Sequence, residues 1–241
     1  MIPLRDNIRS AHFPVVNTAI IGACVAVFIY QLTAPAAIET QAFRPAYLAS
    51  LSAINELGLG AAATSLFLSM FMHGGVLHLG FNMLFLWIFG DNVEDRMGHL
   101  RYLIIYLVCG VIATLTHSLI ALAGVRVTGA ASLAVPMVGA SGAIAGVLGA
   151  YFKLFRGATV RTLVFLFVFV TVMDLPASLF IIIWFILQLV SGFGALGQVG
   201  AGGIAFWAHV GGFVAGLFLV GLFVPRRRAS RGPRILDVRL D

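Results

Sequence analysis

Residues 138–150 read VGASGAIAGVLGA, a short apolar run in which one hydroxyl group, that of Ser141, lies among four glycines. Gly142 and Gly146 form a G-x-x-x-G pair, a spacing that lets two membrane helices approach each other backbone to backbone. The pattern predicts that Ser141 begins a helix that another helix contacts closely. A second role is open to Ser141 on its own, because a serine at a helix start can cap a free backbone amide.

The composition is that of an integral membrane protein. Of the 241 residues 61% are hydrophobic and 10% are charged, whereas soluble proteins have about 25% charged residues. The formal net charge of +6 would fit a nucleic-acid partner, but the positions of the basic residues favour membrane topology as its cause. Cys24 and Cys109 lie in apolar runs, so we expect small core residues rather than a disulfide or metal site.

Six apolar segments are predicted to cross the bilayer, which gives an all-α, polytopic bundle. Their expected bounds are 15–32, 76–90, 102–123, 139–155, 175–190 and 204–224. The first exceeds the roughly 7–15 apolar residues of a signal peptide, so we expect it to be retained, although Ala34-Pro35-Ala36 resembles a cleavage site. The predicted divisions are an N-terminal segment 1–14, a six-span domain 15–224 and a basic tail 225–241.

Residues 158–190 are too long for one span, since a helix of that length would measure about 50 Å. Asp174-Leu175-Pro176 is typical of a helix start, and we expect the fifth span to begin at Leu175. The conformation of residues 158–173 is left open, and the glycine-rich segment Ser191–Gly203 is expected to form a loop.

The distribution of positive charge predicts the orientation. Six spans place both termini on one side, where thirteen of the fifteen Lys and Arg residues fall, and only Arg44 and Arg126 lie opposite. Cytoplasmic loops carry the excess of basic residues. We therefore expect cytoplasmic termini. The expected location is a cell membrane of the bacterial (inner-membrane) type.

Four polar side chains fall inside predicted spans, where polar groups are costly and mark candidate sites. Ser141 and His209 both lie about 22 Å from the cytoplasmic boundary, and His78 and Asn82 lie at about 20 and 14 Å. His78 and Asn82 are four residues apart and share a helix face. Individually, His209 fits a core histidine and Asn82 an interhelical hydrogen bond, but the similar depths favour one site.

These residue types suggest acyl-transfer chemistry. A serine hydroxyl needs a base in hydrogen-bond contact, and His209 is the candidate. The oxyanion that forms needs fixed donors, for which the Ser141 backbone amide, His78 and Asn82 are available. Carboxylates fall outside this depth, so we expect a Ser–His dyad rather than a triad.

Three motifs in this order resemble the rhomboid family of intramembrane serine proteases: GASG at 139–142, HGGVLHLGFN at 73–82 and AHVGG at 208–212, with Glu94-x-Arg96 also fitting. The resemblance implies that Ser141 is the nucleophile, His209 the general base, and His78 and Asn82 the oxyanion donors. It also implies cleavage of single-span membrane proteins, with span 5 and the following loop as the usual gate. His73 matches a frequent family histidine, for which we expect a structural role.

Two positions depart from the family pattern. Well-studied members have an aromatic residue four positions after the serine that stacks on the histidine, where this chain has Ala145. We therefore expect Phe206 or Trp207 to orient His209. The first loop also lacks the Trp-Arg pair of some members, which affects how it docks in the membrane.

Two alternatives remain. One is a non-proteolytic rhomboid-like protein that binds or escorts membrane clients, although such proteins typically lack the serine or histidine. The other is a metal site made by His73, His78 and His209, but H-E-x-x-H is absent from the sequence and catalytic zinc usually has defined ligand spacing. We expect no cofactor, no metal and no nucleic-acid partner. The expected partners are transmembrane protein substrates and the lipid bilayer, and the oligomeric state is open.

Overall fold

A computed structural model describes residues 1–49, 58–166, 169–195 and 205–224. The basic tail 225–241 and most of the glycine-rich loop therefore lie outside the described residues. The elements are β1 Ile2–Asp6, α1 Val15–Thr33, α2 Ala37–Gln41, η1 Pro45–Leu48, α4 Leu59–Ser69, α5 Val76–Phe85, η2 Leu86–Gly90, α6 Asp91–Met97, α7 His99–Thr128, η3 Ala130–Ala134, α8 Ser141–Leu154, β2 Thr159–Leu166, β3 Phe169–Pro176, α9 Ala177–Ala195 and α10 Phe206–Phe223.

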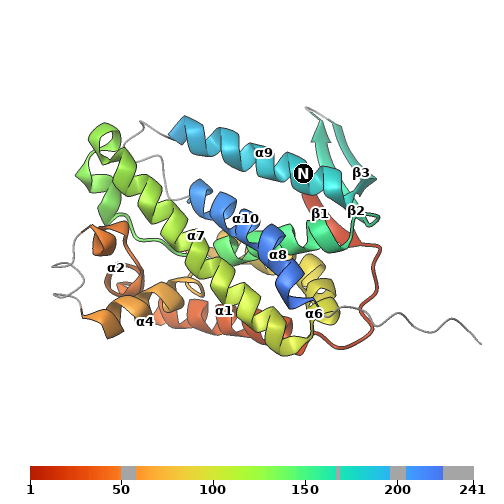
Figure 1. Cartoon of the computed structure of the whole chain (residues 1–241), viewed down its shortest axis with the longest axis horizontal. Helices are drawn as coiled ribbons and strands as arrows, with labels where there is room; N and C mark the ends of the chain where they lie inside the picture. The colour runs from red at the N-terminus through yellow and green to blue at the C-terminus, as the bar shows by residue number, and fades with distance from the viewer. Residues whose placement is uncertain (50–57, 167–168, 196–204, 225–241) are drawn as a thin grey trace, which may run out of the picture.

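The chain forms a mostly helical membrane bundle, as predicted (Figure 1). Among the described residues, five helices are long and apolar enough to span a bilayer, and Ser141–Leu154 is a shorter apolar helix. The count of six spans and the side on which the termini lie stay predictions. The second predicted span continues past Gly90 to Met97 through a π-turn at Leu86–Gly90.

Helix α8 forms the core of the bundle. Every residue from Ala143 to Tyr151 is buried, and the main neighbours of α8 are α10 and α7. A short helix without charged residues in its first turns can be enclosed on all sides, because it exposes no group that needs water. Its position in the bundle centre fixes where Ser141, its first residue, lies.

The glycines of α8 and α10 allow these two helices to touch. A Cβ at Gly212 or Gly216 in α10 would overlap the carbonyl oxygens of Gly142 or Gly146 in α8, and a Cβ at Gly149 would overlap the backbone of Phe213. Small residues permit such close approach in membrane bundles. The glycine-mediated contact expected from the sequence is therefore confirmed.

Glu94 joins the start of α1 to α6. Its carboxylate is 1% exposed and accepts hydrogen bonds from the backbone N–H groups of Val16 (2.9 Å) and Asn17 (2.7 Å). Negative charge at a helix N-terminus satisfies free amides and complements the helix dipole. The Asn17 side chain in turn donates to the Leu86 carbonyl at the π-turn (2.9 Å), so one polar network ties three segments together.

A three-stranded antiparallel sheet, in the order β1-β2-β3, lies at one end of the bundle near the start of α9 (Figure 1). Within the stretch 158–173, whose conformation the sequence left open, the described residues 159–166 and 169–173 form strands, which suit their β-branched and aromatic side chains. The N-terminal segment supplies β1, in which Ile2 pairs with Leu163.

The predicted helix start at Asp174 is wrong. Strand β3 continues through Pro176, and α9 begins at Ala177. Asp174 pairs across the hairpin with Arg161, whose guanidinium donates two hydrogen bonds of 2.8 and 2.9 Å to the carboxylate. The acid therefore serves a cross-strand ion pair rather than a helix cap, and the Arg161 partner lowers the Asp174 pKa.

Candidate active site

Ser141 and His209 meet at the interface of α8 and α10. His209 Nε2 lies 2.8 Å from Ser141 Oγ, within hydrogen-bond distance. Ser141 is the first residue of α8, and His209 lies in the first turn of α10. The glycine contact one turn farther along, between Gly212 and Gly142, holds the two backbones close enough for this short distance.

The other ring nitrogen of His209 has a partner that the sequence analysis missed. His209 Nδ1 lies 2.7 Å from Gln188 Oε1 in α9. The Trp184 ring, one turn earlier in α9, lies 5.8 Å from the His209 ring with an interplanar angle of 38°. The signal available was a polar amide in an apolar helix, the same kind of signal that identified Asn82.

The expectation that Phe206 or Trp207 orients His209 is wrong. The indole of Trp207 packs edge-to-face on Phe193, with ring centroids 5.0 Å apart. Ala145 is fully buried in α8. The ring of His209 is instead held from α9, through Gln188 and Trp184.

His78 lies beside Gly139, directly before the serine helix. A Cβ at Gly139 would lie 2.8 Å from His78 Nε2 and 3.6 Å from Ser141 Oγ, so both polar atoms border the same small space. Gly139 has φ +123°, a conformation that favours glycine. His78 Nδ1 accepts from the Gly74 N–H at 3.3 Å, which leaves Nε2 as the protonated nitrogen, available to donate.

Asn82 follows His78 by one turn in α5 and is 8% exposed. Its Nδ2 is buried, and no described residue accepts a hydrogen bond from it. Because buried donors are normally satisfied, this amide is a candidate donor for a further acceptor.

His73 is held by its backbone. The Gln31 side chain donates to the His73 carbonyl (3.0 Å) and accepts from its N–H (2.9 Å). The His73 ring packs edge-to-face on that of His78, with centroids 5.2 Å apart. Burial, and next the neighbouring His78, lower the His73 pKa to about 4. This arrangement supports a structural role in placing His78.

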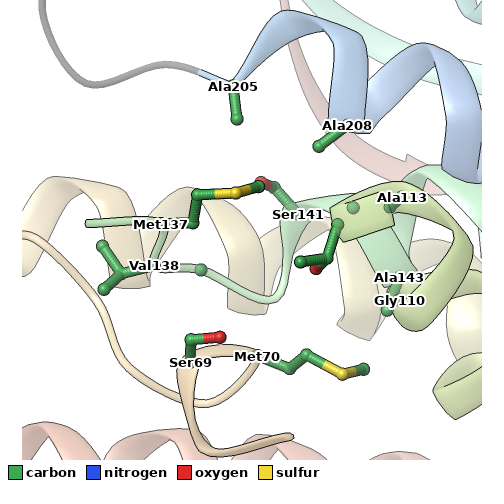
Figure 2. A pocket seen from close by; sticks show the side chains of 13 residues that line it. Ser69, Met70, Gly110, Ala113, Met137, Val138, Ser141, Ala143, Ala205 and Ala208 are labelled. Carbon is green, nitrogen blue, oxygen red and sulfur yellow. The ribbon is translucent and has the colours of Figure 1, made fainter. Parts of the chain in front are cut away.

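Ser141 faces a small cavity (Figure 2). Its volume is about 30 Å³, enough for about two water molecules. Gly110, Ala113 and Ala143 lie on one side, and Met137 and Val138 lie on another. His78 and Asn82 are outside the described residues that line the cavity. The cavity therefore gives space next to the hydroxyl rather than between all four predicted residues.

Comparisons with known proteins agree with these motifs. The model of the Rhomboid domain matches residues 60–226. The chain belongs to the rhomboid family. It is 30% identical over 166 residues to "Rhomboid protease GluP" of Bacillus subtilis, covering 69% of this chain and 27% of that protein.

Two eukaryotic proteins are also similar in sequence to part of this chain. "Rhomboid protein 1, mitochondrial" of Saccharomyces cerevisiae is 35% identical over 100 residues, 40% of this chain and 27% of that protein. "RHOMBOID-like protein 5" of Arabidopsis thaliana is 32% identical over 151 residues, 62% of this chain and 40% of that protein. The matches span about a quarter to two fifths of these relatives' lengths. The family and the apolar helices make the chain an integral multi-pass membrane protein, and support a protease-type function.

Proposed function

We propose that this chain is an intramembrane serine endopeptidase that cleaves single-span membrane proteins. Ser141 is the nucleophile, His209 the general base, and His78, Asn82 and the Ser141 backbone N–H the oxyanion donors. The observation that carries the proposal is the 2.8 Å distance between Ser141 Oγ and His209 Nε2, across two different helices. We place the active protein in a cell membrane of the bacterial type.

The reaction follows from the geometry. Ser141 Oγ attacks the scissile carbonyl carbon while its proton passes to His209 Nε2. The negative oxygen of the tetrahedral intermediate accepts hydrogen bonds from the donors. Collapse breaks the C–N bond, and His209 returns its proton to the leaving amine. A water, deprotonated by His209, then attacks the acyl-serine ester. Collapse breaks the ester C–O bond, His209 returns the proton to Ser141 Oγ, and the acid is released.

Asn82 supports this assignment more directly than His78. Its buried Nδ2 has no hydrogen-bond partner among the described residues, and a buried donor left without a partner costs about 1–3 kcal/mol. An oxyanion that accepts from Nδ2 removes that cost only when it forms. Such a donor contributes mainly to the transition state, which is the condition for raising kcat.

The test is labelling of the purified full chain by a fluorophosphonate probe, with Ser141→Ala and His209→Ala as comparison variants. We expect labelling of the wild-type chain and none of Ser141→Ala. Equal labelling of Ser141→Ala would reject the nucleophile. A wild-type chain that is neither labelled nor cleaves a transmembrane substrate would favour the client-binding alternative. Loss of cleavage on adding a chelator would favour the metal site.

A further inference from the structure

Gln188 occupies a position that the Ser–His dyad alone does not explain. Helix α9 is otherwise strongly apolar, yet it places this amide oxygen 2.7 Å from His209 Nδ1. A polar side chain in a membrane helix is costly unless it is paired. The simplest explanation is an interhelical hydrogen bond that holds α9 to α10. Such a bond stabilises membrane proteins by about 0.6 kcal/mol on average.

The tautomer that His209 needs favours a role for Gln188 beyond holding α9 to α10. A neutral histidine has one protonated nitrogen and one accepting nitrogen. Nε2 must be the acceptor if it is to take the Ser141 proton, so Nδ1 must carry the hydrogen. Gln188 Oε1 is an acceptor at that nitrogen and disfavours the opposite, inactive tautomer. The titratable groups that interact electrostatically with His209 are His78 and His117. Neither has a carboxylate that could accept the Nδ1 hydrogen.

Helix α9 presents Gln188 from its less buried half. Ala177, Phe180 and Ile181 at its first turns are buried, and the Ala177 N–H donates to the Ala158 carbonyl at 2.9 Å. The second half exposes its lipid-facing side, with Leu187 and Val190 exposed by 54% and 63%. Helix α9 is fixed at the end next to the sheet, and near His209 it packs on α10 through Phe185 against Phe213 (ring centroids 4.5 Å apart) and Phe193 against Trp207 (5.0 Å).

This placement makes the hydrogen bond sensitive to the tilt of α9. Gln188 lies eleven residues after Ala177, about 16 Å along the helix. A tilt of about 5° around the fixed end moves Gln188 by roughly 1.4 Å over that length. Such a movement away from α10 takes the Oε1–Nδ1 distance past about 3.6 Å, at which no hydrogen bond remains.

We propose that Gln188 is a positioning residue that holds His209 in the tautomer and orientation needed to accept the Ser141 proton, so that the base is competent only while α9 packs against α10. The inference rests on the proposed protease function. It adds to that function a third member, supplied by a different helix, and a link between the position of α9 and the chemical step.

The experiment compares Gln188→Met, Gln188→Glu and the control Leu187→Met in the purified full chain. Gln188→Met keeps the side-chain length and removes the acceptor, whereas Leu187→Met changes an exposed neighbour. Kinetics of a transmembrane substrate give kcat and KM separately, and thermal unfolding reports on folding. We expect kcat of Gln188→Met to fall about 10- to 100-fold, less than the roughly 10⁴-fold effect of losing a triad carboxylate, with KM and Tm close to wild type.

The pH–rate profile of Gln188→Glu distinguishes a positioning role from a merely structural one. A carboxylate at Nδ1 restores the acceptor and favours the protonated ring. We expect this variant to recover kcat at high pH and to shift the acidic limb of the pH–rate profile upward. Should Gln188→Met fold poorly, the Gln188→Glu profile still decides the question.

The outcomes separate the two proposals. Absence of Ser141-dependent activity in the wild-type chain would overturn the proposed function itself. An active wild type, with kcat unchanged in Gln188→Met or with a pH profile unchanged in Gln188→Glu, would overturn the role of Gln188 and leave the protease assignment standing. A fall in kcat that Leu187→Met matches would also reject it.

Discussion

The contact between Gly212 and Gly142 sets the distance between the candidate nucleophile and base. Gly212 lies three residues after His209, and Gly142 directly follows Ser141. In Gly212→Ala the new Cβ would lie 3.0 Å from the Gly142 carbonyl carbon and closer still to its oxygen. Because carbon contacts are ordinarily about 3.5–4.0 Å, the two helices must separate by on the order of 1 Å.

That separation is large compared with the tolerance of the Ser–His pair. The present 2.8 Å distance would become roughly 3.8 Å, beyond the range of a hydrogen bond. A misplacement of about 1 Å in a catalytic geometry can cost about 10²-fold in rate. Overpacking of this kind also costs about 1–3 kcal/mol in the free energy of unfolding.

The assay is cleavage of a transmembrane substrate by Gly212→Ala, with thermal unfolding measured on the same preparation. Gly221→Ala is the matched control, because it lies in the same helix and its nearest neighbour is the flexible end of Lys153, at 3.2 Å. We expect Gly221→Ala to behave like wild type. Unchanged cleavage and Tm in Gly212→Ala would refute the argument that this contact sets the distance, as would equal losses in both variants.

Three further outcomes follow from other contacts. Asn82→Ala should lower kcat about 10²- to 10³-fold without lowering Tm, since its Nδ2 has no described partner to lose; a stability loss matching the activity loss would contradict this. Glu94→Ala removes the charged acceptor of two amides at the start of α1 and should cost about 1.5–3 kcal/mol in unfolding free energy, while Glu39→Gln at an exposed ion pair should cost less than about 1 kcal/mol. Burial raises the pKa of Asp6 to about 6; the Tyr151 hydroxyl opposes this shift and the nearby Asp91 reinforces it. In the unfolded chain Asp6 therefore ionises at lower pH than in the folded chain. The contribution of Asp6 to the free energy of unfolding then falls as the pH rises from about 4 to 6. Thermal unfolding across that range should show a flatter pH dependence in Asp6→Asn, and an unchanged slope would reject the assignment.

Local patterns in the sequence were sufficient to predict the mostly helical membrane bundle and the glycine contact between α8 and α10. Glycine spacing alone predicted that α8 and α10 touch, because in lipid only small residues permit that approach. The same reasoning carries no information about strand β1, whose pairing with β2 joins residues more than 150 positions apart. Sheet pairing depends on a distant partner, and Ile2–Asp6 alone has no such signature.

Asp174 shows how a local rule can be overruled by packing. An acid followed by proline is typical of a helix start, yet here Arg161 on the facing strand gives the carboxylate two charged hydrogen bonds. Gln188 was missed for a different reason. Its contact with His209 depends on the direction in which α9 faces, and hydropathy predicts that a segment spans the membrane without predicting its rotation about the helix axis.

Charge is distributed unevenly in the described part of the molecule, and this has a consequence for mechanism. The carboxylates of Asp6, Glu94 and Asp174 all have hydrogen-bond donors as partners, whereas His209 contacts the neutral groups of Ser141 and Gln188. The desolvation of a carboxylate beside His209 would be offset only while the ring is protonated, whereas the amide of Gln188 needs no paired cation. An amide dipole also stabilises the imidazolium less than a full charge does. A site of this kind must therefore depend more on the placement of α8, α9 and α10 than on electrostatic pairing, so variants that move these helices should affect kcat more than variants that alter distant charges.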